Sequence, residues 1–221
     1  ALGELSLDGD LLPVVGALPA AMAAAEEDRI LLCPRASGAE AAWVEACTVI
    51  GAGNLLEIVR HFSGDNVLEP ARPGEVTTDP ATRDLRDVKG QERAKRALEI
   101  AAAGRHHLMM IGPPGAGKSM LAARMPGILP PLTPGEALET SMIHSIAGLL
   151  TDGGISRTRP FCEPHHTASM AALIGGGRTA QPGQISLAHN GVLFMDEFPE
   201  FPRNVLETLR QPIETGEVMV A

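Results

Sequence analysis

An eight-residue run, GPPGAGKS, occupies positions 112–119 and matches the phosphate-binding pattern G-x-x-x-x-G-K-[ST]. The four apolar residues before it, 108–111, favour a buried parallel strand. Residues 118–124 favour the first turns of a helix, whose positive dipole end would face an anion. A strand, a glycine loop and a helix in this order predict a nucleotide-binding α/β domain.

Within this loop each residue type suits a task. The three glycines allow successive N–H groups to converge on a phosphate, Lys118 can reach the β and γ oxygens, and the Ser119 hydroxyl can ligate Mg²⁺. A plain glycine turn is the alternative, but such a turn needs no Gly-Lys-Ser triple. We therefore expect ATP or ADP with Mg²⁺ to bind through Gly112, Pro113, Pro114, Gly115, Ala116, Gly117, Lys118, Ser119 and Met120.

A second run, Val192–Met195, is apolar and ends in Asp196 and Glu197, the pattern of a Walker B strand. Alone, such a run is often just a strand entering a turn, but here Asp196 follows Lys118 of the P-loop by 78 positions. Asp196 would then hold the Mg²⁺ through water, and Glu197 would be the catalytic carboxylate that polarises the attacking water, with Lys118 as its catalytic partner on the phosphates.

Charge and composition suggest two domains. The chain has 221 residues, 44% of them hydrophobic, which is enough to build two modest cores. Residues 1–79 hold 13 acidic and 4 basic side chains, whereas residues 80–221 hold 14 of each.

Residues 80–130 are locally basic, with nine basic and four acidic groups, which is a weak indication of a polyanion partner. Phosphate binding, or a solvated basic helix face, explains it equally well.

The cysteines and the apolar runs of the sequence bear on the cellular compartment of the protein. Cys33, Cys47 and Cys162 are widely spaced and odd in number, so we expect reduced thiols in a cytoplasmic protein. No stretch approaches a membrane span, and no membrane partner is expected. The chain starts without Met on a strand-like run and stops on another, 217–221, so we interpret it as a piece of a longer protein.

The amino-terminal third predicts an α/β unit over residues 1–62. We expect a hairpin over 5–15, a helix over 18–27 and a strand over 30–33. Ser37 to Glu40 has the pattern of a capping box for a helix through position 46. A strand over 48–50 and a helix that follows Asn54 complete the unit. Residues 63–82, with three prolines, are predicted to be a linker, and a second domain occupies 83–221.

Three segments resemble a known family. The run 87–91 (DVKGQ) before the P-loop looks like the entry to an AAA+ ATPase module of the magnesium-chelatase-like group. The runs 159–169 (RPFCEPHHTAS) and 182–191 (PGQISLAHNG), with glycines at 175–177, resemble the ComM/YifB branch of that group.

The resemblance implies a fold: a P-loop NTPase (AAA+) parallel-sheet core, preceded by a partial Lon-protease-like (S5-type) α/β domain. It implies that Val88 and Gln91 lie against the nucleotide. It also implies that sensor 1, the arginine finger and the lid of the module follow position 221.

The same resemblance implies a homo-hexameric ATPase that drives DNA branch migration in natural transformation, with branched or single-stranded DNA as partner. An ATP-driven protein-remodelling or chelatase-type motor subunit is the alternative. Proteolysis is not expected, because the segment 13–19 resembles the Lon segment that carries the catalytic lysine, and here Pro19 stands at that position.

Two histidine pairs raise other possibilities. His165 and His166, three residues after Cys162, could suggest a zinc site, but no second ligand cluster is visible in the sequence. Neighbouring side chains of extended backbone point in opposite directions, so we expect these two not to share an ion. By analogy the loop would contact the polymer or sense the ATP state. His106 and His107 are expected to be the polar start of the P-loop strand.

Overall fold

The computed structural model describes residues 1–78, 83–150, 152–176 and 180–218. Contacts divide the chain into two compact units, Ala1–Thr77 with Pro134–Ser156, and Thr78–Thr133 with Arg157–Ala221. Parts of three expected features lie outside the described residues: 79–82 of the linker, Gly177 of the glycine run, and 219–221 of the final strand-like run.

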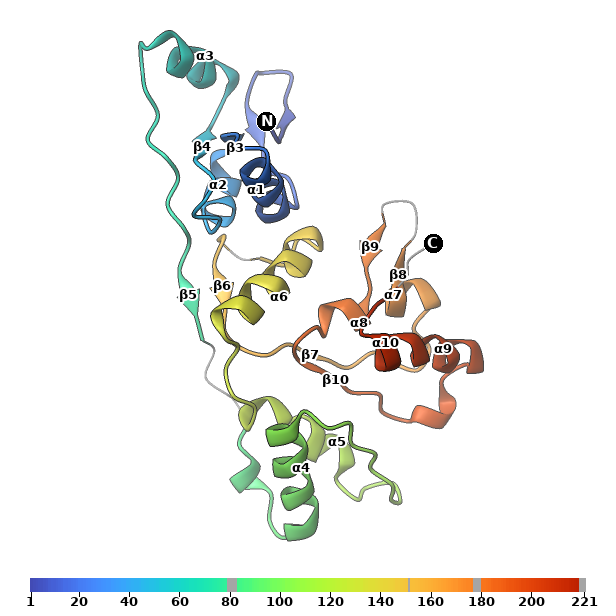
Figure 1. Ribbon diagram of the computed structural model, residues 1–221. Helices are drawn as coiled ribbons and strands as arrows, with labels where there is room; N and C mark the ends of the chain where they lie inside the picture. Colours follow the sequence, from blue (N-terminus) through green and yellow to red (C-terminus); the bar gives the residue numbers. More distant parts are fainter. Residues whose placement is uncertain (79–82, 151, 177–179, 219–221) are drawn as a thin grey trace. The chain divides into compact units, whose positions relative to one another are not determined.

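The first unit is built on a parallel pair of strands. Strands β3 (Leu31–Pro34) and β4 (Val49–Ala52) pair with Leu31 opposite Val49. Helices α1 (Ala17–Glu26) and α2 (Arg35–Ala41) pack against them, and small side chains allow the close approach (Figure 1). The resulting core consists of Ala17, Ala21, Leu31, Cys33, Ala41, Cys47 and Val49.

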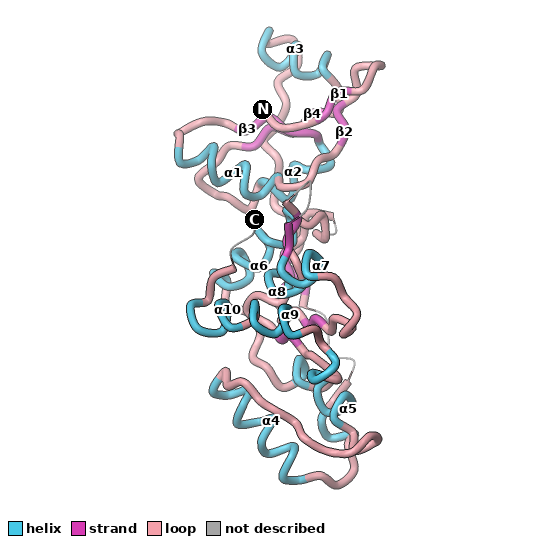
Figure 2. The backbone as a smooth tube through the Cα atoms, turned by 90° about the vertical axis from the view of Figure 1, so that its right-hand side faces the viewer, coloured by secondary structure: helices cyan, strands magenta, loops and turns pink. Residues whose placement is uncertain are grey.

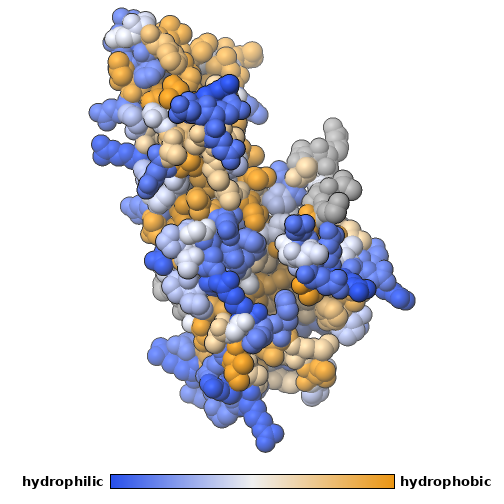
Figure 3. Space-filling model, in the orientation of Figure 1, coloured by the Kyte–Doolittle hydropathy of each residue, from blue (hydrophilic) through white to orange (hydrophobic). Residues whose placement is uncertain are grey.

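The first unit contains the predicted hairpin and the predicted helix cap at Asn54. Strands β1 (Glu4–Leu5) and β2 (Leu11–Leu12) form the expected antiparallel hairpin. Helix α3 (Leu55–Ser63) begins after Asn54, whose side chain accepts from the Glu57 N–H at 2.9 Å, as predicted. Most apolar side chains of α3 are exposed, namely those of Leu55, Leu56, Val59 and Phe62, and hydrophobic residues gather around this helix in Figure 3.

The predicted capping box at Ser37 is wrong. Helix α2 begins two residues earlier, at Arg35 after Pro34, and ends at Ala41 instead of continuing to position 46. The Ser37 hydroxyl donates to the Val14 carbonyl at 3.5 Å, and the Glu40 carboxylate accepts from the Leu18 N–H at 3.0 Å. Both side chains therefore make tertiary contacts, which outweigh the local pattern.

The segment between the two Walker motifs supplies the rest of the first unit. Helix α6 (Pro134–Ile146) packs against α1, and strand β6 (Ile155–Ser156) pairs in parallel with β5 (Val76–Thr77). The indole N–H of Trp43 donates to the Gly153 carbonyl at 2.8 Å. Residues 134–156, counted with the ATPase core in the sequence analysis, are thus held by residues of the amino-terminal third.

The second unit begins with the P-loop region. It contains η1 (Leu85–Asp87), α4 (Glu92–Gly104), α5 (Lys118–Ala122) and η2 (Met125–Gly127). Leu85, Val88, Leu98 and Leu121 form its buried cluster. This cluster joins the residues that lead into α4 to the helix that follows the P-loop.

The rest of the second unit surrounds the Walker B run. Strands β7 (Phe161–Cys162) and β10 (Val192–Leu193) pair in parallel, while β8 (Gly175–Gly176) and β9 (Gln181–Pro182) form an antiparallel pair. The helical elements are α7 (Met170–Ile174), α8 (Gln184–Leu187), η3 (Phe198–Glu200), α9 (Arg203–Thr208) and α10 (Arg210–Thr215). Figure 2 shows how short the strands are.

The predicted P-loop strand is wrong. Residues 105–117 contain no strand, and Met109 and Ile111 are 73% and 88% exposed, with only Met110 packed against the Leu85 cluster. A buried parallel strand is stable only between hydrogen-bonded neighbours, and among the described residues β7 and β10 pair with each other instead. His106 and His107 accordingly begin no strand. The architecture is mixed α/β with two-stranded sheets, and a continuous AAA+ sheet is absent from the described residues.

Candidate functional site

The P-loop closes on its own lysine. The Lys118 ammonium donates to the carbonyls of Gly112 at 2.9 Å and Pro113 at 3.1 Å. Gly115 and Gly117 have φ values of 77° and 82°, in the left-handed region that glycine enters without strain. The loop is therefore curled around its lysine, and the ammonium could exchange these carbonyls for phosphate oxygens.

Gln91 holds the opposite side of the loop. Its side-chain amide donates to the Ala116 carbonyl at 3.3 Å, and a Cβ at Gly117 would lie only 2.9 Å from the Gln91 Nε2. The positive φ of Gly117 is what favours glycine at this position. Met120 is exposed at the start of α5, and Val88 is 2% exposed within the Leu85 cluster.

The two Walker motifs meet at a hydroxyl and a carboxylate. The Ser119 hydroxyl donates to the Asp196 Oδ2 at 2.5 Å, and the other carboxylate oxygen accepts from the Glu197 N–H at 2.9 Å. Hard oxygen donors of this kind are what Mg²⁺ prefers in proteins. Ser119 and Asp196 could together hold such an ion.

Glu197 has an unusual backbone and a partner that the sequence analysis missed. Its φ of 52° lies in the left-handed region, which a non-glycine residue seldom adopts outside turns and functional sites. Its carboxylate Oε2 lies 3.1 Å from the Nδ1 of His166. The sequence analysis noted both the histidine pair and the Walker B glutamate. Their spacing in the sequence did not predict that they would be in contact.

The expectation that His165 and His166 point apart is wrong. Their ring centroids lie 4.1 Å apart, because residues 165–168 form a turn in which the Ala168 N–H donates to the His165 carbonyl. No group of three metal-ligating side chains occurs among the described residues. Burial raises the pKa of the Cys162 thiol.

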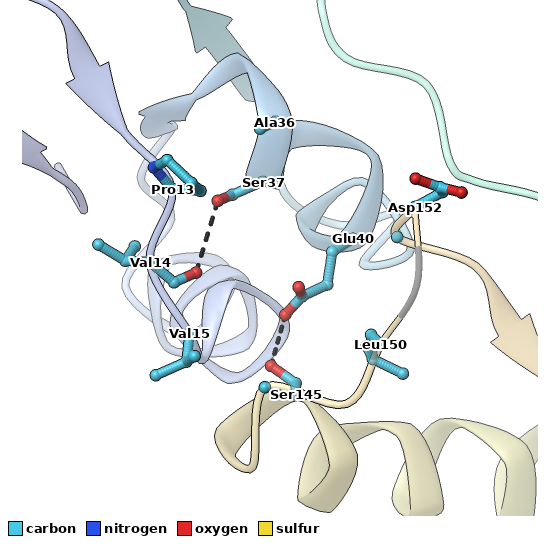
Figure 4. Close-up of a pocket in the computed structure, with 11 residues that line it drawn as sticks. Pro13, Val14, Val15, Ala36, Ser37, Glu40, Ser145, Leu150 and Asp152 are labelled. Carbon is cyan, nitrogen blue, oxygen red and sulfur yellow. Dashed lines mark hydrogen bonds between the residues drawn. The ribbon is translucent and has the colours of Figure 1, made fainter.

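A cavity of about 360 Å³ lies within the first unit (Figure 4). Glu40 and Ser145 point toward one another across it, and the Ser145 hydroxyl donates to the Glu40 carboxylate. Pro19 lies in the first turn of α1, where proline is tolerated, and no lysine lines this cavity in the described part of the chain. In this cavity the Glu40 carboxylate and the Ser145 hydroxyl are bonded to each other.

The three cysteines are free thiols, as predicted, and burial raises the pKa of Cys33 to about 11. The longest described helices, α4 and α6, have 13 residues each, and none of the helices described is long and apolar enough to cross a bilayer.

The glycine loop, its lysine and the paired hydroxyl and carboxylate are features of a P-loop protein of the AAA+ ATPase type. The family model described as "Magnesium chelatase, subunit ChlI" matches residues 84–221. The chain belongs to this family, which confirms the resemblance seen in the sequence.

Known proteins similar to this chain support the same branch of the family. YifB of Salmonella typhimurium is 46% identical over 98% of the chain and 43% of its own length. The competence protein ComM of Haemophilus influenzae is 45% identical over the whole chain and 44% of its own length. An archaeal Lon protease of Archaeoglobus fulgidus is 42% identical over 72 residues, which are 32% of this chain and 11% of that protein. The chain therefore spans less than half the length of the YifB and ComM relatives.

Proposed function

We propose that this chain carries the nucleotide site of an ATP-driven AAA+ motor that moves DNA. The observation that carries the proposal is the 2.5 Å contact between Ser119 and Asp196, which joins the P-loop to the Walker B carboxylate. A serine at the start of α5 and an aspartate after β10 have no structural need to meet, whereas a Mg-nucleotide site requires both oxygens.

In this proposal each residue of the site has a separate role in phosphoryl transfer. The backbone of Gly112–Ser119 cradles the phosphates of ATP or ADP, and Lys118 turns from its loop carbonyls to the β and γ oxygens. Ser119 and Asp196 would hold Mg²⁺, which neutralises charge developing on the phosphates. Glu197 accepts the proton of the attacking water. Gln91 supports the loop through the Ala116 carbonyl, and the backbone next to Val88 faces the adenine.

The DNA partner is proposed from the relatives. ComM, 45% identical over the whole chain, is named a competence protein, and residues 80–130 carry a basic excess. We propose a homo-hexameric ring in the complete protein, acting on branched or single-stranded DNA as a branch-migration helicase in the cytoplasm. Contacts to the DNA backbone would make its binding strongly dependent on salt.

A second candidate is a protein-remodelling or chelatase-type motor. The match of residues 84–221 to the chelatase family model favours it. Such a motor would use the same ATPase site against a protein partner, so the nucleotide chemistry is shared and only the stimulating partner differs.

The test uses the complete protein, with Lys118→Ala as the binding variant and Arg96→Ala as its control. Arg96 is 71% exposed and pairs with Glu99 on the surface of α4. Titration calorimetry should show nucleotide affinity reduced at least tenfold in Lys118→Ala alone, since one charged phosphate contact is lost. Equal affinities in all three proteins would refute the nucleotide site.

The DNA part is tested by mobility shifts with branched DNA at several salt concentrations and by phosphate release with and without DNA. Salt-dependent binding and DNA-stimulated release are expected. Nucleotide turnover that DNA leaves unchanged would favour the second candidate.

A further inference from the structure

We propose that His166 is a positioning residue for Glu197, holding its carboxylate in the orientation from which it acts on the attacking water. This inference rests on the proposed ATPase function. It is carried by the 3.1 Å contact between the His166 Nδ1 and the Glu197 Oε2, which connects the Pro-His-His-Thr turn to the end of the Walker B run.

The Glu197 carboxylate needs a contact from another residue to stay in one orientation. Its side chain is 64% exposed, and an exposed glutamate samples several rotamers. Its own backbone is in the left-handed region, and its N–H is used to bond Asp196. The main chain therefore determines where the side chain starts, and a contact at the far end is needed to determine where the carboxylate lies.

The imidazole of His166 is itself held on several sides. Its ring lies against the His165 ring at 4.1 Å and meets the edge of the Phe201 ring at 6.4 Å and 82°. Phe201 is 3% exposed and belongs to the buried cluster with Leu173 and Val205. The orientation of His166 is thus fixed by the core of the second unit, which makes it a rigid support.

The turn that presents His166 is closed by its own hydrogen bonds. The Ala168 N–H donates to the His165 carbonyl at 2.8 Å, and the His165 Nδ1 lies 2.8 Å from the Thr167 hydroxyl. His165 therefore stabilises the turn, while His166 faces the glutamate. In the contact with a carboxylate the His166 Nδ1 must carry the proton, because both carboxylate oxygens are acceptors.

Removing the support should affect catalysis without affecting nucleotide binding. In the complete protein, His166→Ala should lower kcat by about 10- to 100-fold, the usual loss when an outer partner of a functional ligand is removed. The KM and the calorimetric affinity for Mg-ATP should stay within about twofold, since neither histidine belongs to the P-loop. His166→Asn, whose amide reaches the position of Nδ1, should restore most of the turnover.

Two comparisons separate positioning from a merely structural role. His107→Ala, at an exposed position outside the turn, is the matched control and should leave turnover unchanged, because it touches neither the turn nor the contact to Glu197. The double variant His166→Ala/Glu197→Gln should be no slower than Glu197→Gln alone, because a support has no effect without its carboxylate.

The outcomes are distinguishable. Equal losses in His107→Ala and His166→Ala, additive losses in the double variant, or raised turnover in His166→Ala would each overturn the positioning role. Unchanged turnover in Glu197→Gln would instead show that the base lies elsewhere, whereas equal nucleotide affinity in the wild type and Lys118→Ala would refute the proposed function itself. Thermal unfolding of each variant identifies any loss that comes from a misfolded protein, and His166→Asn then decides the question by rescue.

Discussion

Ser119 and Asp196 are 77 positions apart in the sequence, yet the hydroxyl of one donates to the carboxylate of the other at 2.5 Å. Hydroxyl and carboxylate oxygens are donors that Mg²⁺ accepts in proteins, so these two residues could together hold the ion of a Mg-nucleotide. The contact joins the end of the P-loop to the carboxylate that follows the Walker B strand.

Ser119→Ala and Asp196→Asn should each weaken the dependence of nucleotide binding on magnesium. We expect the ratio of ATP affinities measured with Mg²⁺ and with a chelator to fall toward one, because each variant loses an oxygen donor suited to the ion. Calorimetry under both conditions checks this. Ser169→Ala, which removes a cap of α7, is the control and should keep the wild-type ratio. A full magnesium effect in both site variants would remove the metal role from this pair.

Glu197→Gln should retain nucleotide binding and lose turnover by about 100-fold or more, because an amide keeps the size of the carboxylate but cannot accept the proton. Phosphate release and calorimetry on the same preparation separate the two effects. The matched control is Glu200→Gln in the neighbouring η3, where turnover should be unchanged. Turnover that survives in Glu197→Gln would place the base elsewhere.

The local features of the candidate site were predictable from the sequence, whereas its surroundings were not. The P-loop, the helix after it and the cap at Asn54 depend on residues a few positions apart, so motif and propensity rules describe them. The prediction of a strand before the P-loop is wrong for a physical reason. An apolar sequence indicates that a segment favours burial, but it does not supply the hydrogen-bonded neighbours that a strand requires.

The contacts between distant segments were beyond sequence reasoning for a related reason. Ser37 and Glu40 have the spacing of a cap, yet their side chains bond to Val14, Leu18 and Ser145. The apolar residues of α6 predict a helix face without saying which surface it covers. The contact of His166 with Glu197 likewise depends on a turn whose geometry no periodicity encodes.

Glu40→Ala should destabilise the first unit by about 1–3 kcal/mol, because the Leu18 N–H and the Ser145 hydroxyl lose their half-buried acceptor. Urea unfolding measures the difference. Glu40→Gln keeps an acceptor oxygen and should cost less, and Glu45→Ala, at an exposed position, should cost almost nothing. Identical midpoints for Glu40→Ala and Glu45→Ala would show that the contact contributes nothing.

Glu57 should make stability fall at acid pH. The Gly53 N–H, at 2.8 Å, and the Arg35 guanidinium, at 2.7 Å, hold the pKa of this carboxyl below its ordinary value. A lowered folded pKa contributes stability above the unfolded pKa of about 4.3, and that contribution is lost as pH falls through the folded pKa.

Urea midpoints recorded from pH 6 downward, at steps of about half a unit, should therefore decline less steeply for Glu57→Gln than for the wild type below about pH 4.3. Glu69→Gln, at an exposed position, serves as the control and should follow the wild type. Parallel curves for wild type and Glu57→Gln would contradict the assignment.

The bond between the Trp43 indole and the Gly153 carbonyl gives the chain an intrinsic optical probe. Trp43 is the one tryptophan in the 221 residues, and there is no tyrosine to obscure its emission. Its fluorescence thus reports on whether the segment between the two Walker motifs stays attached to the amino-terminal unit. Release of that segment from the indole can therefore be followed as a shift in emission wavelength, without a label.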